Sequence, residues 1–252
     1  MSVGVEIRGL SKSFGALDVV RPLDLDVEPG AFVSLVGPSG CGKSTLLRMV
    51  AGLEVPSSGS VRIGGRSPAE VRAEKRLAVV PQQPGLLPWR TVAQNARLLL
   101  EVNRRRSPAH HPDPLDLLAE VGLTDFADAY PHELSGGMQQ RVALVRGFAL
   151  GAPLVVMDEP FAALDEITRT EMRDLLARLL EQHPATVLFV THSIAEAAHL
   201  SDRVLVMAPR PTSVVADVAI ALPRPRTTAI EDTLAFTEVC AELRRHLHGA
   251  MR

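Results

Sequence analysis

Residues 31–45 read Ala-Phe-Val-Ser-Leu-Val-Gly-Pro-Ser-Gly-Cys-Gly-Lys-Ser-Thr, and this stretch decides the fold. Its first six residues form an apolar run that predicts a β-strand, and residues 43–50 have the spacing of a helix that Gly52 closes. Between them, Gly37–Thr45 matches the pattern G-x-x-x-x-G-K-[ST] in full. Glycines let backbone N–H groups turn toward phosphate oxygens, Lys43 can reach terminal phosphates, and the Ser44 hydroxyl can bind Mg²⁺. The stretch therefore predicts a phosphate-binding loop rather than an ordinary glycine-rich turn.

The rest of the chain predicts an α/β fold around this loop. Apolar runs of strand length lie at residues 77–80, 154–157 and 187–190, without the polar alternation of a half-exposed sheet. Such strands are typical of a parallel sheet covered on both faces. Helical spacing lies between them, so strands and helices alternate.

Two stretches depart from this alternation. Residues 3–36 alternate over short segments with turn residues between them, which predicts an antiparallel β layer beside the parallel sheet. Strands are missing between Thr91 and about Tyr130, so we expect a helical subdomain inserted over about residues 83–150. The basic run 104–106 in this segment is interpreted as a solvated helix C-terminus, favoured by the helix dipole, rather than a phosphate site.

Composition excludes several classes of protein. The 252 residues include 27 Lys+Arg and 29 Asp+Glu, a formal net charge of −2, whereas proteins held on nucleic acid usually carry a basic excess. The two cysteines, Cys41 and Cys240, show no metal or disulfide spacing and fit a reducing compartment. No signal-peptide pattern is found, and no apolar run reaches the roughly 18–20 residues of a membrane span. We expect a cytosolic chain without nucleic-acid partners that does not itself cross a membrane.

Polar residues follow two of the predicted parallel strands. Asp158 and Glu159 come after the run 154–157, and His192 comes shortly after 187–190. Ligands of open α/β sheets bind at this carboxyl edge, so Asp158 can hold Mg²⁺, Glu159 can act as a base on water, and His192 can meet the same phosphate. An acidic pair alone is usually a solvated strand end, and the upstream phosphate loop favours the catalytic interpretation.

A second anion-binding helix start lies at Leu134-Ser-Gly-Gly-Met-Gln139. Ser135 is a good helix cap, and the two glycines after it expose backbone N–H groups. On physical grounds this could be only a cap. Because one active site needs one phosphate cradle, the second suggests the hypothesis that it serves a nucleotide held by another copy.

Taken in order, these motifs resemble the ATP-binding cassette (ABC) family, and the resemblance runs from residue 3 to about 225. It implies an ABC ATPase domain with a P-loop NTPase core over 3–225, followed by a helical tail at 226–252. It further implies ATP and Mg²⁺ as ligands and a head-to-tail dimer with two ATP molecules between the subunits.

The resemblance also implies roles for individual residues. The implied catalytic residues are Lys43, Gln82 of the Q-loop, Glu159 and the switch residue His192. The implied magnesium ligands are Ser44, Gln82 and Asp158. The implied ATP-binding residues are Phe14, which would stack on adenine, the loop residues Gly37, Pro38, Ser39, Gly40, Cys41, Gly42, Lys43, Ser44 and Thr45, the signature residues Ser135, Gly136, Gly137 and Gln139, and the D-loop residue Asp165.

Within this family, residues 84–91, 161–165 and 201–211 resemble the ATPases of nitrate, sulfonate and taurine importers. The resemblance implies uptake of a small solute through a separate permease, with an external solute-binding protein and a site on the cytoplasmic face of the membrane. Importer ATPases for a thiamine precursor or riboflavin share much of the pattern. Trp89, the one tryptophan, belongs either to the subdomain core or to a groove for a permease helix near Gln82–Trp89. A soluble ABC ATPase outside transport is the alternative from another class, and a nucleotide-binding module without turnover is a third.

Overall fold

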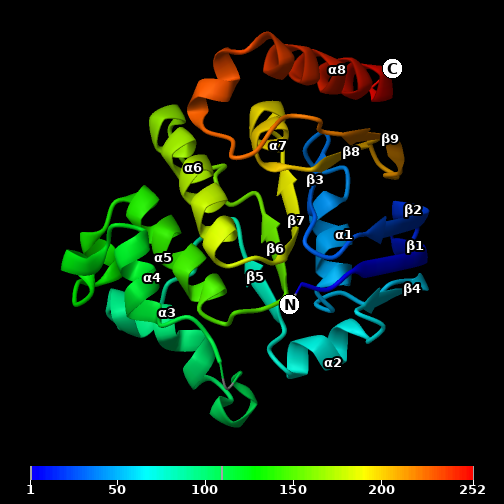
Figure 1. Cartoon of the computed structure of the whole chain (residues 1–252). Coiled ribbons are helices and arrows are strands. Elements are labelled where there is room, and N and C mark those ends of the chain that lie inside the picture. The colour runs from blue at the N-terminus through cyan, green and yellow to red at the C-terminus, as the bar shows by residue number, and fades with distance from the viewer. Residues whose placement is uncertain (1, 109, 252) are drawn as a thin grey trace.

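A six-stranded sheet forms the centre of the computed structural model, which describes residues 2–108 and 110–251 (Figure 1). Ala109 and Arg252, which fall in the expected subdomain and tail, lie outside the described residues. The strand order is β5 (Leu77–Val80), β6 (Leu154–Asp158), β7 (Thr186–Thr191), β3 (Phe32–Val36), β8 (Arg203–Met207) and β9 (Val214–Ala219). All neighbours are parallel except β8 and β9. The expected α/β fold with a mainly parallel sheet is therefore confirmed.

A three-stranded antiparallel sheet lies beside it, in the order β2 (Leu17–Val27), β1 (Val5–Phe14) and β4 (Ser58–Ile63). This confirms the expected antiparallel layer, except that β3 belongs to the central sheet and β4 was not predicted. Only the last residues of β4 alternate, and Ser58-Gly-Ser60 at its start has the composition of a turn. Helix α2 (Pro68–Ala73) was also missed, although Ser67 and Glu70 form a capping box that marks its start.

Alternate residues of the parallel strands enter two different cores. Val33 and Leu35 of β3 pack toward helix α1 (Lys43–Val50) and the antiparallel sheet. Val155 of β6 and Phe189 of β7 pack on the opposite face, against helices. Successive side chains of a strand point to opposite faces, so strands covered on both sides need unbroken apolar runs. This is the physical reason why the apolar runs marked these strands.

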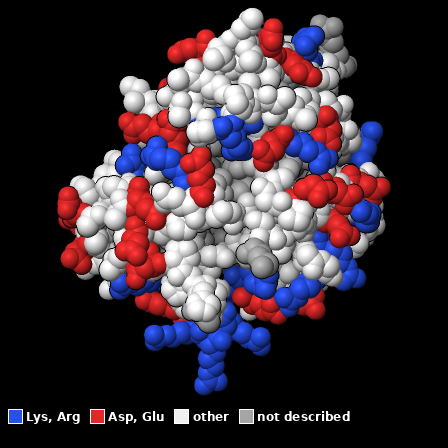
Figure 2. Space-filling model, viewed as in Figure 1, with Lys and Arg blue, Asp and Glu red and all other residues white. Residues whose placement is uncertain are grey.

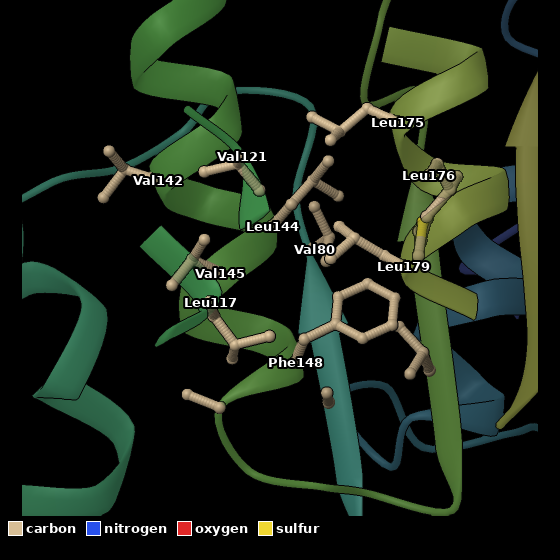
Figure 3. Packing of buried hydrophobic residues seen from close by; sticks show 14 of the residues in the cluster. Val80, Leu117, Val121, Val142, Leu144, Val145, Phe148, Leu175, Leu176 and Leu179 are labelled. Carbon is tan, nitrogen blue, oxygen red and sulfur yellow. The ribbon is translucent and has the colours of Figure 1, made fainter. Parts of the chain in front are cut away.

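Helices cover the second face and fill the chain between β5 and β6. They are α3 (Val92–Glu101), α4 (Pro114–Glu120) and α5 (Gly136–Phe148), with α6 (Glu166–Gln182) following β6. One-turn helices η1 (Arg104–Arg106), η2 (Thr124–Phe126) and η3 (Pro131–Glu133) connect them. Figure 3 shows Leu117 of α4, Phe148 of α5 and Leu176 of α6 packed around Val80 of β5. The helical segment therefore shares its core with the sheet that carries the phosphate loop.

The run Arg104–Arg106 was wrongly assigned to a helix C-terminus. Helix α3 ends at Glu101, Asn103 has a left-handed backbone, and the three arginines form the separate, exposed turn η1. Figure 2 shows basic side chains projecting at the lower tip of the molecule, where this loop lies. The interruption at Asn103 keeps these charges away from the carbonyl end of α3.

The C-terminal part of the chain packs on the sheet edge formed by β8 and β9 (Figure 1). It contains α7 (Ile194–Leu200), η4 (Thr228–Asp232) and α8 (Leu234–Ala250), and α8 buries Phe236, Cys240 and Leu243 against α7 and these strands. No helix among residues 2–108 and 110–251 has both the length and the apolar composition of a bilayer span.

Arg226 attaches this C-terminal part to the core. Its buried guanidinium donates hydrogen bonds to carbonyl groups of two segments, namely those of Ala198, His199, Ser201, Ile220 and Leu222. Burial lowers the pKa of Arg226 to about 10, so the group stays charged at neutral pH. The side chain satisfies the last carbonyls of α7, which have no partner within the helix.

We predict that Arg226→Leu lowers the free energy of unfolding by about 3 kcal/mol, because buried carbonyl groups lose their donor. Arg90→Leu is the control, since Arg90 donates to the Glu101 carboxylate in a partly exposed ion pair that contributes about 1 kcal/mol or less. Urea unfolding followed by circular dichroism measures both. Equal losses for the two variants would contradict the special role of Arg226.

Candidate nucleotide site

The loop between β3 and α1 needs its glycines for both conformation and space. Gly40 and Gly42 have φ of 72° and 126°, which side-chain-bearing residues rarely adopt. A Cβ on Gly37 would lie 2.9 Å from Met207, and one on Gly42 would lie 3.1 Å from Thr212. The first N–H groups of α1 have no partner within the helix, so the loop directs free donors and the positive helix end toward one region. This geometry suits a phosphate group.

Lys43 bends back over the loop. Its ammonium group is buried and donates to the carbonyl groups of Gly37 at 2.8 Å and Pro38 at 3.0 Å. Cys41 in the same loop is a buried free thiol. The hydrogen bonds hold one positive charge at the centre of the cradle.

Ser44 and Asp158 meet although they are 114 positions apart in the chain. The Ser44 hydroxyl donates to a carboxylate oxygen of Asp158 at 2.6 Å. A hydroxyl and a carboxylate are the hard oxygen ligands that Mg²⁺ prefers, so this pair fits that ion. Gln82, expected as a third ligand, is exposed, and no hydrogen bond joins it to the pair among the described residues.

Glu159 and His192 also come together. His192 Nδ1 lies 3.3 Å from a Glu159 carboxylate oxygen. Glu159 has a φ of 46°, and its N–H donates to the carbonyl of Val190 at the end of β7. A left-handed backbone costs a non-glycine residue about 1–2 kcal/mol, and such strain gathers at functional sites.

Glu196 lies behind this pair and was missed in the sequence. It accepts a hydrogen bond from the Thr191 hydroxyl and lies 3.6 Å from the Arg169 guanidinium. Burial raises the pKa of Glu196, while these two partners act in the opposite direction. The spacing Ser193-x-x-Glu196, typical of a helix start, was the available signal, and the Ser193 side chain accepts a hydrogen bond from the Glu196 N–H at the start of α7.

A cavity of about 130 Å³ lies between the phosphate loop and Glu159, the candidate catalytic base. It is lined by Gly40, Gly42, Lys43, Ser44, Thr45, Glu159 and Arg210. The structure therefore brings together residues expected from two separate motifs.

Arg210 is a lining residue that the sequence reasoning missed. It follows β8, which is parallel to β3, so the rule that found His192 would have placed it at the same edge.

Phe14 lies outside this cavity, at the end of β1. Its ring is 48% exposed, with the Lys12 ammonium 4.6 Å from the ring centre. Lys12 is itself held by Glu54 at 2.6 Å. An exposed aromatic ring can stack on a flat base.

The expected signature and D-loop residues do not line the cavity either. Ser135 caps α5 by accepting a hydrogen bond from the Met138 N–H, and Ser135 and Gly136 are exposed. Gln139 donates to the carbonyls of Pro131 and Leu134 in its own loop. Asp165 caps α6, and hydrogen bonds from Thr168 hold the pKa of Asp165 below its ordinary value.

Trp89 is 71% exposed, so its interpretation as subdomain core is wrong. Side chains of α3 and α5 hold the loop that carries Trp89 by hydrogen bonds to its backbone. The buried Asn95 side chain bonds to Leu87 and to the Arg90 carbonyl, and Arg146 donates to the Gly85 carbonyl at 2.8 Å. Trp89 thus projects from a well-anchored loop.

Comparisons with known proteins identify relatives of the whole chain. Residues 20–162 match the family model described as ABC transporter. The aliphatic sulfonates import ATP-binding protein SsuB 1 of Xanthomonas axonopodis pv. citri is 44% identical over 250 residues, covering 98% of each chain. A protein of the same name from Pseudomonas syringae pv. syringae is 45% identical, covering 88% of each chain.

Two solved structures of MJ0796, a bacterial ABC transporter cassette, share the fold. Its dimeric structure has a TM-score of 0.73 and 29% identity, covering 87% of this chain and 100% of that chain. A dimeric post-hydrolysis state bound to ADP and Pi has a TM-score of 0.71 and 30% identity, with the same coverage.

The strain at Glu159 can be tested by substitution. We predict that Glu159→Gly is more stable than Glu159→Ala by about 1 kcal/mol, because glycine adopts the positive φ without a Cβ clash. Thermal unfolding without nucleotide measures the difference. At an unstrained position glycine would be the less stable of the two, and that order would contradict the strain.

Proposed function

Because the chain belongs to the ABC transporter family, we propose that it is the ATP-hydrolysing subunit of an importer for aliphatic sulfonates or similar small solutes. The observation that carries the proposal is the shared cavity of the phosphate loop and Glu159, at the edge where Asp158 and His192 also lie. The names of the sulfonate-import relatives support the cargo class. Neither the soluble alternative nor the other cargoes has such support.

Binding of ATP uses the loop. N–H groups of the loop at the start of α1 and the charge of Lys43 surround the phosphate chain, and each charge-assisted hydrogen bond strengthens binding. The ring of Phe14 stacks on the adenine. Ser44 and Asp158 would hold Mg²⁺, with Gln82 as the proposed further ligand. An ion held there would supply positive charge beside the phosphate oxygens.

Hydrolysis uses the pair Glu159 and His192. The Glu159 carboxylate accepts a proton from the attacking water, and His192 Nδ1 holds that carboxylate in position. The strained backbone of Glu159 directs the side chain toward the loop rather than along the strand. Asp158, one residue earlier, keeps its hydrogen bond to Ser44, so the two adjacent carboxylates have separate roles.

A second copy completes the site. At the start of helix α5, Ser135 and Gly136 are exposed and Gly137 is half-buried, and none of the three lines the cavity of the same chain. We propose that they bind the phosphates held by the partner, with Gln139 and Asp165 supporting that surface. The dimeric cassettes among the structural relatives support this arrangement.

The membrane partner docks on the helical segment, which we assign to residues 83–150 of a 3–225 ATPase domain with a tail at 226–252. Trp89, on the loop that follows Gln82, provides an exposed aromatic contact. Motion of Gln82 on ATP binding then reaches the permease through this loop. The subunit lies on the cytoplasmic face of the membrane, and an external solute-binding protein delivers the cargo.

Affinity purification of the tagged chain from gently solubilised native membranes tests the proposed function. Mass spectrometry should identify a multi-spanning permease among the recovered chains, and uptake of a labelled alkanesulfonate should depend on ATP. Recovery of soluble partners alone would contradict a role in transport and leave the ATPase assignment intact.

We predict that Trp89→Ala folds as the parent does but no longer recovers the permease in this affinity purification. An exposed substitution changes the free energy of unfolding by about 0.5 kcal/mol or less, whereas the docking contact loses an aromatic anchor. Leu234→Ala, at a residue 73% exposed on α8, is the control and should keep the permease. Equal recovery of the permease with both variants would contradict the docking role.

A further inference from the structure

Arg210 lines the nucleotide cavity together with Lys43 and Glu159. It belongs to the loop 208–213 between β8 and β9, far from both phosphate-binding motifs in the chain. Its guanidinium donates one hydrogen bond to the carbonyl of Gly40. A carbonyl of the phosphate loop is thus within direct reach of this side chain.

The loop that carries Arg210 is fixed on both sides. Ala208 and Ser213 close it with a backbone hydrogen bond of 2.9 Å, and the Thr212 hydroxyl donates to the Ala208 carbonyl at 3.0 Å. Thr212 also exchanges backbone bonds with Val19 and Arg21 of β2, and its methyl group faces Gly42. These contacts fix the backbone on both sides of Arg210 and place Thr212 next to Gly42 of the phosphate loop.

Charge in the cavity favours a second cation for a polyphosphate. The Lys43 ammonium already donates to two loop carbonyls, and the Glu159 carboxylate adds a negative charge to the lining. A guanidinium has five donors in a planar fork that matches phosphate oxygens, and the described contacts of Arg210 use one of them on Gly40. The remaining donors can bind a phosphate without breaking that bond.

We propose that Arg210 is a nucleotide-binding residue that contacts the phosphate chain of ATP or ADP. The inference rests on the proposed nucleotide site around Gly37–Thr45. It adds a contact from outside that loop and links the β8–β9 loop to nucleotide occupancy.

Three substitutions separate phosphate binding from support of the loop. Arg210→Gln keeps a donor for the Gly40 carbonyl and loses the charge, Arg210→Lys keeps the charge, and Arg210→Ala loses both. Arg62→Ala is the matched control, since Arg62 is an exposed arginine that donates to another glycine carbonyl, that of Gly65.

Binding of fluorescent ATP and ADP analogues to each variant provides the readout. Loss of a charge-assisted contact predicts Kd values about tenfold or more higher for Arg210→Gln and Arg210→Ala, and within about threefold of the parent for Arg210→Lys and Arg62→Ala. Unfolding midpoints without nucleotide should stay the same. Parent-like binding by Arg210→Gln would overturn the proposal and leave Arg210 as a support of the loop.

Lys43→Ala distinguishes failure of the site from failure of this inference. If Lys43→Ala binds ATP as tightly as the parent, the proposed nucleotide site and the role of Arg210 are both overturned. If Lys43→Ala loses binding while Arg210→Gln does not, the site stands and the Arg210 inference alone fails.

Discussion

Parallel pairing of the central strands is the constraint on which the site depends. Val36 of β3 pairs with Thr191 of β7 and with Val206 of β8, and Asp158 of β6 pairs with Val190. Because these strands run in one direction and end in register, the residues that follow them meet at one edge. The phosphate loop, Glu159, His192 and Arg210 all follow such strand ends. Shifting one strand by one residue would exchange its two faces and misplace the group at its end.

Burial on both faces maintains this register. Side chains of β6 and β7 alternate between the core under α1 and the core under α5 and α6, so a shifted strand would disturb both. The stability of the sheet also offsets the backbone strain at Glu159. The left-handed backbone of Glu159 is held by its hydrogen bond to Val190, and its cost of about 1–2 kcal/mol is small beside the burial of several core side chains.

The sequence was most informative where one physical requirement dominates. Gly37–Thr45 is marked by glycines that no other residue can replace, and doubly covered strands such as Leu77–Val80 need continuous apolar runs. It was less informative at β4, where serine and glycine conceal an edge strand, and at Asn103, where a single left-handed residue separates Arg104–Arg106 from α3.

The missed site residues share a different cause. Arg210 contacts Gly40 and Glu196 lies near Arg169, each in another segment of the chain, so strand-end position and helix-start spacing mark where these residues lie but not what they contact. The sequence did not decide between a core position and a permease contact for Trp89, because an apolar cluster has the same sequence pattern whether it is buried or exposed. Its exposure follows from Asn95 and Arg146, which hold the loop by its backbone carbonyls rather than by burying its tryptophan.

We propose that two copies share each nucleotide, since Gly136 and Gly137 at the start of α5 lie outside the cavity of their own chain. Light scattering on the Glu159→Gln variant tests this most directly, because ATP then stays bound without rapid turnover. We predict a mass of 27.1 kDa without nucleotide and twice that value with ATP and Mg²⁺. A mass that stays at 27.1 kDa while ATP saturates the variant would contradict it.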